Sequence, residues 1–138
     1  MDWWTSDKHH SCQITHIFDS PFQVIADALL SICSGANRAE FRLHDEPGQC
    51  IWSMQRMPDR KHLLSLEIRF YRENFEVSKP AYKKMELEVS QDFLVDSFIS
   101  ELEKISQQLK HPKFASDRTC EDFPWDDLKR LQKYKSRN

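Results

Sequence analysis

The sequence predicts an α+β domain: an antiparallel β-meander of about five strands, with two main helices packed on one face and a short C-terminal helix. Three observations support this prediction. Five segments alternate apolar and polar residues, which is the two-residue period of a strand. Two longer segments carry apolar residues at helical spacing. Short turns separate most consecutive strands, which favours antiparallel neighbours.

Strand periodicity begins near the N-terminus, after a segment that lacks it. Residues 1–10 show no regular pattern and are predicted to be an N-terminal tail, which leaves residues 11–138 as a single α+β domain. From residue 11 to residue 18, Cys12, Ile14, His16 and Phe18 alternate with other residues and predict the first strand.

The first helix has clear signals at both ends. Ser20 can accept a hydrogen bond from a free N–H group of the first turn, and Pro21 suits the first helical position. Gly35 can take the left-handed conformation after the last turn. Between these ends an apolar stripe repeats at helical spacing, formed by Phe22, Ile25, Leu29 and Ile32 or Cys33.

Four further strands are predicted at residues 38–45, 49–57, 62–71 and 82–89. Their alternation gives the sheet one apolar face for the helices and one polar face for water or a partner. In the turn from Asp45 to Gly48, proline presets one backbone angle and Gly48 is expected to supply a positive φ. Residues 72–81 are polar and predict a longer surface connection.

The second helix is predicted to begin after Ser90, which can cap it, and to end at Pro112. Its apolar stripe is Leu94, Phe98, Leu102, Ile105 and Leu109. A loop over residues 113–123 then leads to a short last helix that begins at Pro124. One face of that helix is apolar and holds Trp125, Leu128 and Leu131.

Composition limits the classes of function. A chain of 138 residues can bury the core of one domain, and 12% aromatic residues with a net charge of -2 argue against disorder. The balanced charge also argues against direct nucleic-acid binding, which needs a basic excess. With no secretory leader and no apolar run near ~18 residues, we expect a cytoplasmic protein with no membrane contact.

Catalytic and cofactor motifs are lacking in the sequence. Two glycines cannot form a phosphate-binding loop, and neither the histidines nor the four cysteines show metal-ligand spacing, so no metal or cofactor is predicted. Cys50 and His44 flank one turn and could form a nucleophile–base pair, although a packed, free thiol is the favoured interpretation. We therefore predict a binding protein; a small enzyme or ligand-binding domain with a site assembled only in the fold is the alternative.

Charged side chains on the outward strand faces, in the first hairpin turn and in an acidic segment near the C-terminus indicate a surface for a protein partner. The outward acids are expected to face Arg42, Arg69 or Lys84 on neighbouring strands. The residues predicted to contact the partner are Asp45, Glu46, Glu67, Arg69, Tyr71, Glu86, Glu88, Asp117, Glu121 and Asp122.

Two blocks of sequence suggest a family. Residues 36–52 (ANRAEFRLHDEPGQCIW) resemble the first hairpin, and residues 123–131 (FPWDDLKRL) the C-terminal end, of small bacterial immunity proteins of contact-dependent growth inhibition and related polymorphic toxin systems. The layout after the first ten residues is similar as well. The resemblance implies only a class of function: stoichiometric occlusion of a cognate toxin domain, often a nuclease, without catalytic residues.

Overall fold

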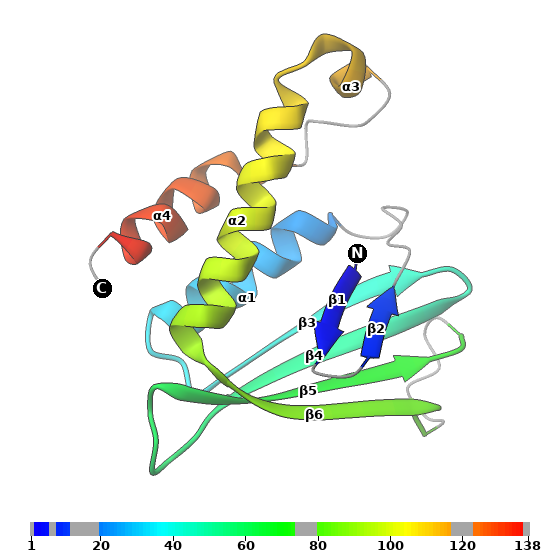
Figure 1. The fold of residues 1–138 in the computed structure, drawn as a ribbon, viewed down its shortest axis with the longest axis vertical. Helices are drawn as coiled ribbons and strands as arrows, with labels where there is room; N and C mark the ends of the chain where they lie inside the picture. Colours follow the sequence, from blue (N-terminus) through cyan, green and yellow to red (C-terminus); the bar gives the residue numbers. More distant parts are fainter. Residues whose placement is uncertain (1, 6–7, 12–19, 74–79, 117–122, 137–138) are drawn as a thin grey trace.

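A four-strand antiparallel meander with helices packed on it forms the frame of the protein (Figure 1). The computed structural model describes residues 2–5, 8–11, 20–73, 80–116 and 123–136. In chain order the elements are β1 (Asp2–Thr5), β2 (Lys8–Ser11), α1 (Pro21–Cys33), β3 (Arg38–Asp45), β4 (Gly48–Arg56), β5 (Leu63–Tyr71), β6 (Lys83–Ser90), α2 (Gln91–Leu109), α3 (Pro112–Ser116) and α4 (Trp125–Lys135).

The main sheet has the strand order β3-β4-β5-β6, in which every neighbour is also the next strand in the chain. This confirms the predicted α+β meander with covering helices. Four of the predicted strands form it, and the fifth, over residues 11–18, falls almost wholly outside the described residues. Within the segment predicted as a tail, β1 and β2 pair with each other as an antiparallel hairpin.

Helix α1 begins and ends as its sequence predicts. The Ser20 hydroxyl accepts a hydrogen bond from the Gln23 N–H at 3.4 Å, Pro21 occupies the first turn, and Gly35 has a φ of 96°. One further contact could not be foreseen, because it comes from β4. The Arg56 guanidinium donates to the Ile32 carbonyl at 3.0 Å, and this carbonyl of the last turn also accepts from the Gly35 N–H at 3.0 Å.

The turn between β3 and β4 differs from its prediction at the glycine. Asp45 pairs with Gly48, the Glu46–Pro47 peptide bond is cis, and Gly48 does not have a positive φ. Glycine is needed there for another reason. A Cβ atom at this position would collide with the carbonyl oxygen of Tyr71 on the neighbouring strand.

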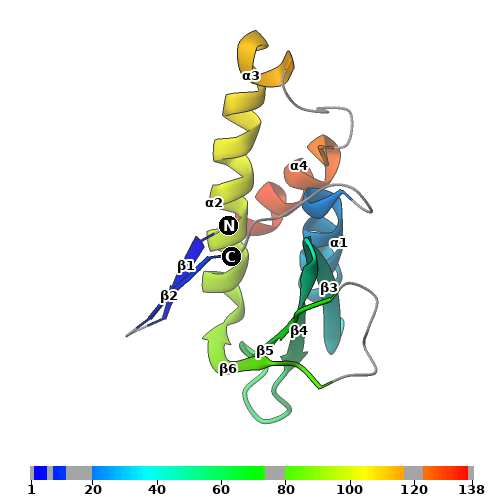
Figure 2. The ribbon, with the colours of Figure 1, turned by 90° about the vertical axis from the view of Figure 1, so that its right-hand side faces the viewer.

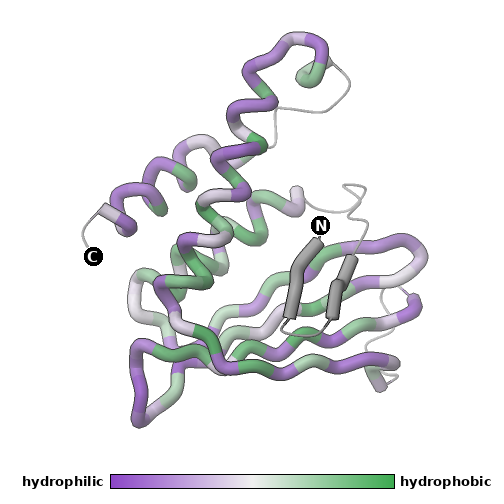
Figure 3. Tube along the Cα trace, in the orientation of Figure 1, coloured by the Kyte–Doolittle hydropathy of each residue, from purple (hydrophilic) through white to green (hydrophobic). Residues whose placement is uncertain are grey.

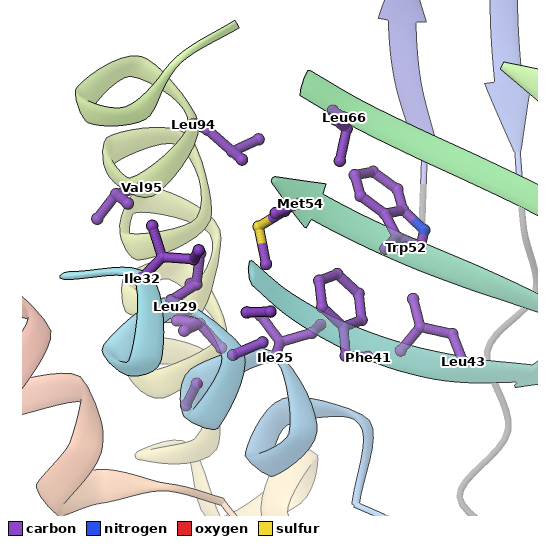
Figure 4. Packing of buried hydrophobic residues seen from close by; sticks show 14 of the residues in the cluster. Ile25, Leu29, Ile32, Phe41, Leu43, Trp52, Met54, Leu66, Leu94 and Val95 are labelled. Carbon is purple, nitrogen blue, oxygen red and sulfur yellow. The ribbon is translucent and has the colours of Figure 1, made fainter. Parts of the chain in front are cut away.

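The core lies between the helices and one face of the sheet. Ile25, Leu29 and Ile32 of α1 are at most 5% exposed and face the inward residues of β3 and β4 (Figure 4). The rings of Phe41 and Trp52 stack at 5.5 Å between centroids. Such aromatic pairs add stabilisation beyond their buried area.

The stripe of α2 is rotated relative to its prediction. Its buried residues are Gln91, Leu94, Val95, Ile99, Leu102 and Ser106. Phe98, Ile105 and Leu109 of the predicted stripe are half-buried at its edge, and Phe98 meets the Phe41 and Trp52 rings edge-on. The stripe rotates because α2 packs against both the sheet and α4, so its buried arc follows two neighbours.

The C-terminal region contains an unpredicted helix. Pro112 does follow the end of α2, but it also opens the short helix α3, so the loop prediction is wrong for residues 113–116. The rest of that predicted loop, residues 117–122, lies outside the described residues. In both views the distal part of α2, with α3, projects beyond the sheet (Figure 2).

Helix α4 docks on α1 and α2 through paired polar groups. The Gln23 amide donates to Asp127 at 2.8 Å, Gln132 donates to Glu103 at 2.7 Å, and Gln91 donates to the Tyr134 hydroxyl at 2.5 Å. Leu128 and Leu131 are buried as predicted. Trp125 is 40% exposed and packs at 4.7 Å on the Phe123 ring, so its predicted place in the core is wrong.

Truncation of Ile99 tests the sheet–helix core. Ile99 is fully buried, so we expect Ile99→Ala to lower the free energy of unfolding by about 2–5 kcal/mol through lost contacts and a residual cavity. Phe93, on the same helix, is 68% exposed, and Phe93→Ala should change it by less than about 0.5 kcal/mol. Urea unfolding measures both, and equal effects would contradict the assigned packing face.

Candidate functional site

The face of the main sheet turned away from the helical core carries rows of charge, which we call the open face. Strand register places Glu40, Ser53, Glu67 and Glu86 in one row across the four strands. The adjacent row is Arg42, Ile51, Arg69 and Lys84, and the next one holds Arg38, Gln55, Ser65 and Glu88. The alternation of polar and apolar residues along β5 and β6 is visible in Figure 3.

Arg69 is the centre of an ion-pair network on the open face. Its guanidinium lies 3.1 Å from Glu40 on β3 and 2.9 Å from Glu67 on its own strand. The Ser53 hydroxyl donates to Glu40 at 2.6 Å and accepts from Arg69 at 3.1 Å. One guanidinium therefore joins three adjacent strands, since its planar fork can serve several acceptors at once.

Lys84 extends the network to the edge of the sheet. Its ammonium lies 2.7 Å from Glu67 and 2.6 Å from Glu86. Hydrogen bonding to Glu67 and then to Glu86 raises the pKa of Lys84, and the bond to Lys84 lowers the pKa of Glu86. Because each shift favours the charged form, these groups stay ionised at neutral pH.

Two further ion pairs lie on this face, one joined to the network through Glu40 and one separate from it. Arg38 lies 3.3 Å from Glu40, and Arg60, in the turn between β4 and β5, lies 2.9 Å from Glu88. All four acids of the open face thus have basic partners. The predicted pairing across neighbouring strands holds for Glu67 with Lys84, whereas Glu86 pairs with Lys84 on its own strand.

Arg42 differs from the other bases of this face. It is half-buried beside Ile51 and forms no ion pair or side-chain hydrogen bond within the described part of the chain. A guanidinium in this state keeps its donors available for a carboxylate from outside the chain. Arg42 is therefore the one base of the described open face whose charge is not already balanced.

At one end of the open face, the outward side chains are buried. His44, Gln49, Ile51 and Tyr71 point outward by strand alternation, yet each is at most 8% exposed. The Gln49 amide donates to the Glu73 carbonyl at 3.4 Å, so the residues directly after β5 lie at this end. Tyr71, which we predicted to contact a partner, is buried here, because strand alternation gives the direction of a side chain but not what lies above it.

The Cys50–His44 pair, which the sequence left open as an alternative, is not formed. Leu43 pairs with Cys50, and both belong to the core cluster, whereas His44 pairs with Gln49 on the opposite face. The sheet therefore separates the thiol from the imidazole. Cys33 is a free thiol, and Cys50 is buried in the core, as expected.

The remaining predicted contact residues fall into two groups. Asp45 is half-buried and Glu46 is exposed, and both lie at the β3–β4 turn. Glu88 forms a separate ion pair with Arg60. Asp117, Glu121 and Asp122 lie outside the described residues.

Sequence reasoning missed Glu40, Ser53, Arg38 and Arg60 as members of this surface. The length of the β3–β4 turn could have predicted that Glu40 and Ser53 lie side by side. Pairing Asp45 with Gly48 places Glu40 opposite Ser53 by simple counting. Arg60 lies in a turn, and its contact with Glu88 depends on the path of that turn.

Comparisons with known proteins give no relative: no protein-family model, curated protein or solved structure matches this chain. Among the described residues, no three or more His, Cys, Asp or Glu side chains are grouped in a way that could hold a metal ion. None of the helices over the described ranges combines the length and apolar character needed to span a bilayer.

A double-mutant cycle tests the network. For Arg69→Met and Glu40→Gln we expect a coupling energy of about 0.5–1 kcal/mol, reduced by added salt, because both side chains are partly shielded and share Ser53. The exposed pair Lys104–Glu101 on α2 is the control, for which we expect a coupling energy of about 0.3–0.5 kcal/mol. Urea unfolding at low and high salt gives both values. No coupling between Arg69 and Glu40 would contradict the network.

Cys33 gives a pH-dependent prediction. Burial and then the nearby Asp92 carboxylate raise the pKa of the Cys33 thiol to about 11, against a smaller opposing effect of Arg56. Since the thiolate is the reactive form, alkylation of Cys33 by iodoacetamide should keep accelerating from pH 8 to about pH 11. Peptide mass spectrometry measures the rate, with circular dichroism to verify folding. A plateau at pH 9, the behaviour of an ordinary thiol, would contradict the assignment.

Proposed function

We propose that this chain is an immunity protein, which binds a cognate toxin domain in the bacterial cytoplasm and covers the active site of that domain. The observation that carries the proposal is the open face, where Glu40, Arg69, Glu67, Lys84 and Glu86 form one network across β3 to β6. The resemblance of residues 36–52 and 123–131 to such proteins supports the same class.

Preorganisation makes the network suitable for tight binding. Long charged side chains normally lose conformational freedom when a partner orders them, at about 0.5–1.5 kcal/mol for each side chain. Here Arg69, Glu67 and Glu40 are already held by one another while keeping between 26% and 40% of their side-chain surface exposed. A rigid toxin surface can dock on them at a smaller entropic cost.

Charge balance indicates how the toxin is recognised. The acids of the open face are neutralised within the chain, so a strongly basic toxin surface gains little long-range attraction from them. Arg42 is the exception and is suited to an acidic side chain of the toxin. Recognition then depends on matching alternating rows of charge over an interface of about 800 Å² on each partner.

Calorimetric titration against the toxin tests the proposal. The titrant is the C-terminal domain of a large secreted protein, where the gene directly upstream encodes one. We expect a one-to-one complex with a Kd at or below ~10 nM, which corresponds to about −11 kcal/mol. Absence of both binding heat and co-elution would remove the immunity function for that pair.

Charge reversal at Arg42 tests which face binds. Arg42→Glu should weaken toxin binding by at least about tenfold, because it replaces the free guanidinium by a repelling carboxylate. It should leave the fold intact, since Arg42 has no ion pair within the described residues. Lys104→Glu, an equal change of charge on α2, is the control and should keep the parent affinity. Equal Kd values for the two variants would exclude the open face as the binding surface.

A further inference from the structure

Strand β6 is an edge of the main sheet. It pairs with β5 on one side, and no described strand pairs with its other side. A free edge presents unpaired backbone N–H and C=O groups, which can pair with a further strand.

Sheet geometry shows which backbone groups of β6 point outward. The Gln91 N–H donates to the His62 carbonyl at 2.9 Å, which makes this facing pair a hydrogen-bonded one. Hydrogen-bonded and non-hydrogen-bonded pairs alternate along antiparallel strands. Val89, Leu87 and Met85 therefore direct their backbone groups toward β5, and the backbone groups of Lys84, Glu86 and Glu88 face outward.

The two edges of the sheet are covered to different extents. On β3, the inward residues Ala39, Phe41 and Leu43 are at most 9% exposed. On β6, the inward residues Met85, Leu87 and Val89 are only half-buried. The core thus covers β6 less completely than β3 and leaves part of its apolar side exposed at this edge.

Exposed aromatic residues flank the same edge. Tyr82 precedes β6 and is 56% exposed, and Phe93 follows it in the first turn of α2 and is 68% exposed. They are two of the three large hydrophobic side chains that are exposed in the described part of the chain. They border the strand in sequence, one at each end.

We propose that the free edge of β6 pairs with β6 of a second copy of this chain, antiparallel and about a two-fold axis at Met85. Lys83 and Lys84 stand at the start of the strand and Glu86 and Glu88 toward its end. A strand with opposite charges at its two ends is complementary to itself only when the copies run antiparallel. The pairing joins two four-strand sheets into one.

Charge also selects the register. With the axis at Met85, Lys84 of each copy faces Glu86 of the other, and both residues direct their free backbone groups across the interface. A shift that moves the axis to Glu86 would place two glutamates directly opposite each other, which is destabilising. The Met85-centred register therefore avoids like-charge pairs on the open face.

The dimer is expected to be weak. Pairing along one short strand buries less surface than the about 800 Å² for each partner that stable complexes need. We expect the mass of the unmodified protein in sedimentation experiments to rise toward that of a dimer between about 10 µM and about 500 µM. A constant monomer mass over this range would overturn the proposal.

Disulfide trapping tests the register. At a non-hydrogen-bonded facing pair the Cα atoms lie about 4.5 Å apart, which is within the range that a disulfide can span. Met85→Cys should therefore form a crosslinked dimer on mild oxidation, seen on a non-reducing gel. Leu87→Cys is the matched control, since its two copies would lie about 13 Å apart.

The outcomes separate cleanly. Crosslinking of the Met85 variant at a rate at least about tenfold above the Leu87 variant and the parent supports the Met85-centred pairing. Equal rates, or faster crosslinking at Leu87, would overturn it. The parent protein is the control for crosslinking through the native cysteines. Because no toxin is present in these experiments, their result is independent of the immunity function.

Discussion

Apolar side chains of α1 and α2 pack against alternate residues of the meander, and this contact decides which face of the sheet meets solvent. Ile25, Leu29 and Ile32 on one side meet Phe41 and Trp52 on the other. Because side chains on a strand alternate, burial of Phe41 forces Glu40 and Arg42 to the opposite face. The charged rows of the open face are thus a consequence of core packing.

The network on that face contributes more to order than to stability. Exposed ion pairs are worth about 0–1 kcal/mol each, far less than a buried aliphatic side chain such as Ile99. What Arg69 provides is geometry, since it fixes Glu40 and Glu67 relative to each other across three strands. Such a surface suits recognition of a protein whose charges match it row by row.

Two different surfaces of one sheet therefore carry the two proposals. The open face has fixed charges and the free guanidinium of Arg42, which suit a protein of different sequence. The edge of β6 has backbone groups and opposite charges at its two ends, which suit its own copy. A two-fold axis perpendicular to the sheet keeps both open faces on the same side, so the two associations are sterically compatible.

The sequence by itself determined the elements that depend on local chemistry. Ser20, Pro21 and Gly35 bound α1, Ser90 caps α2, and strand alternation identified the outward residues Glu67, Arg69 and Glu86. These follow from local hydrogen bonding and from the period of the strand, which are readable over a few residues.

Only the tertiary structure decided what covers each position. Tyr71 and His44 point outward yet are buried, Trp125 has core spacing yet is exposed, and the stripe of α2 rotates to meet two neighbours. The separation of Cys50 from His44 follows from pairing in the sheet, and the partners of Arg69 from register. Burial and cross-strand contact depend on residues distant in the sequence, which periodicity along one segment cannot specify.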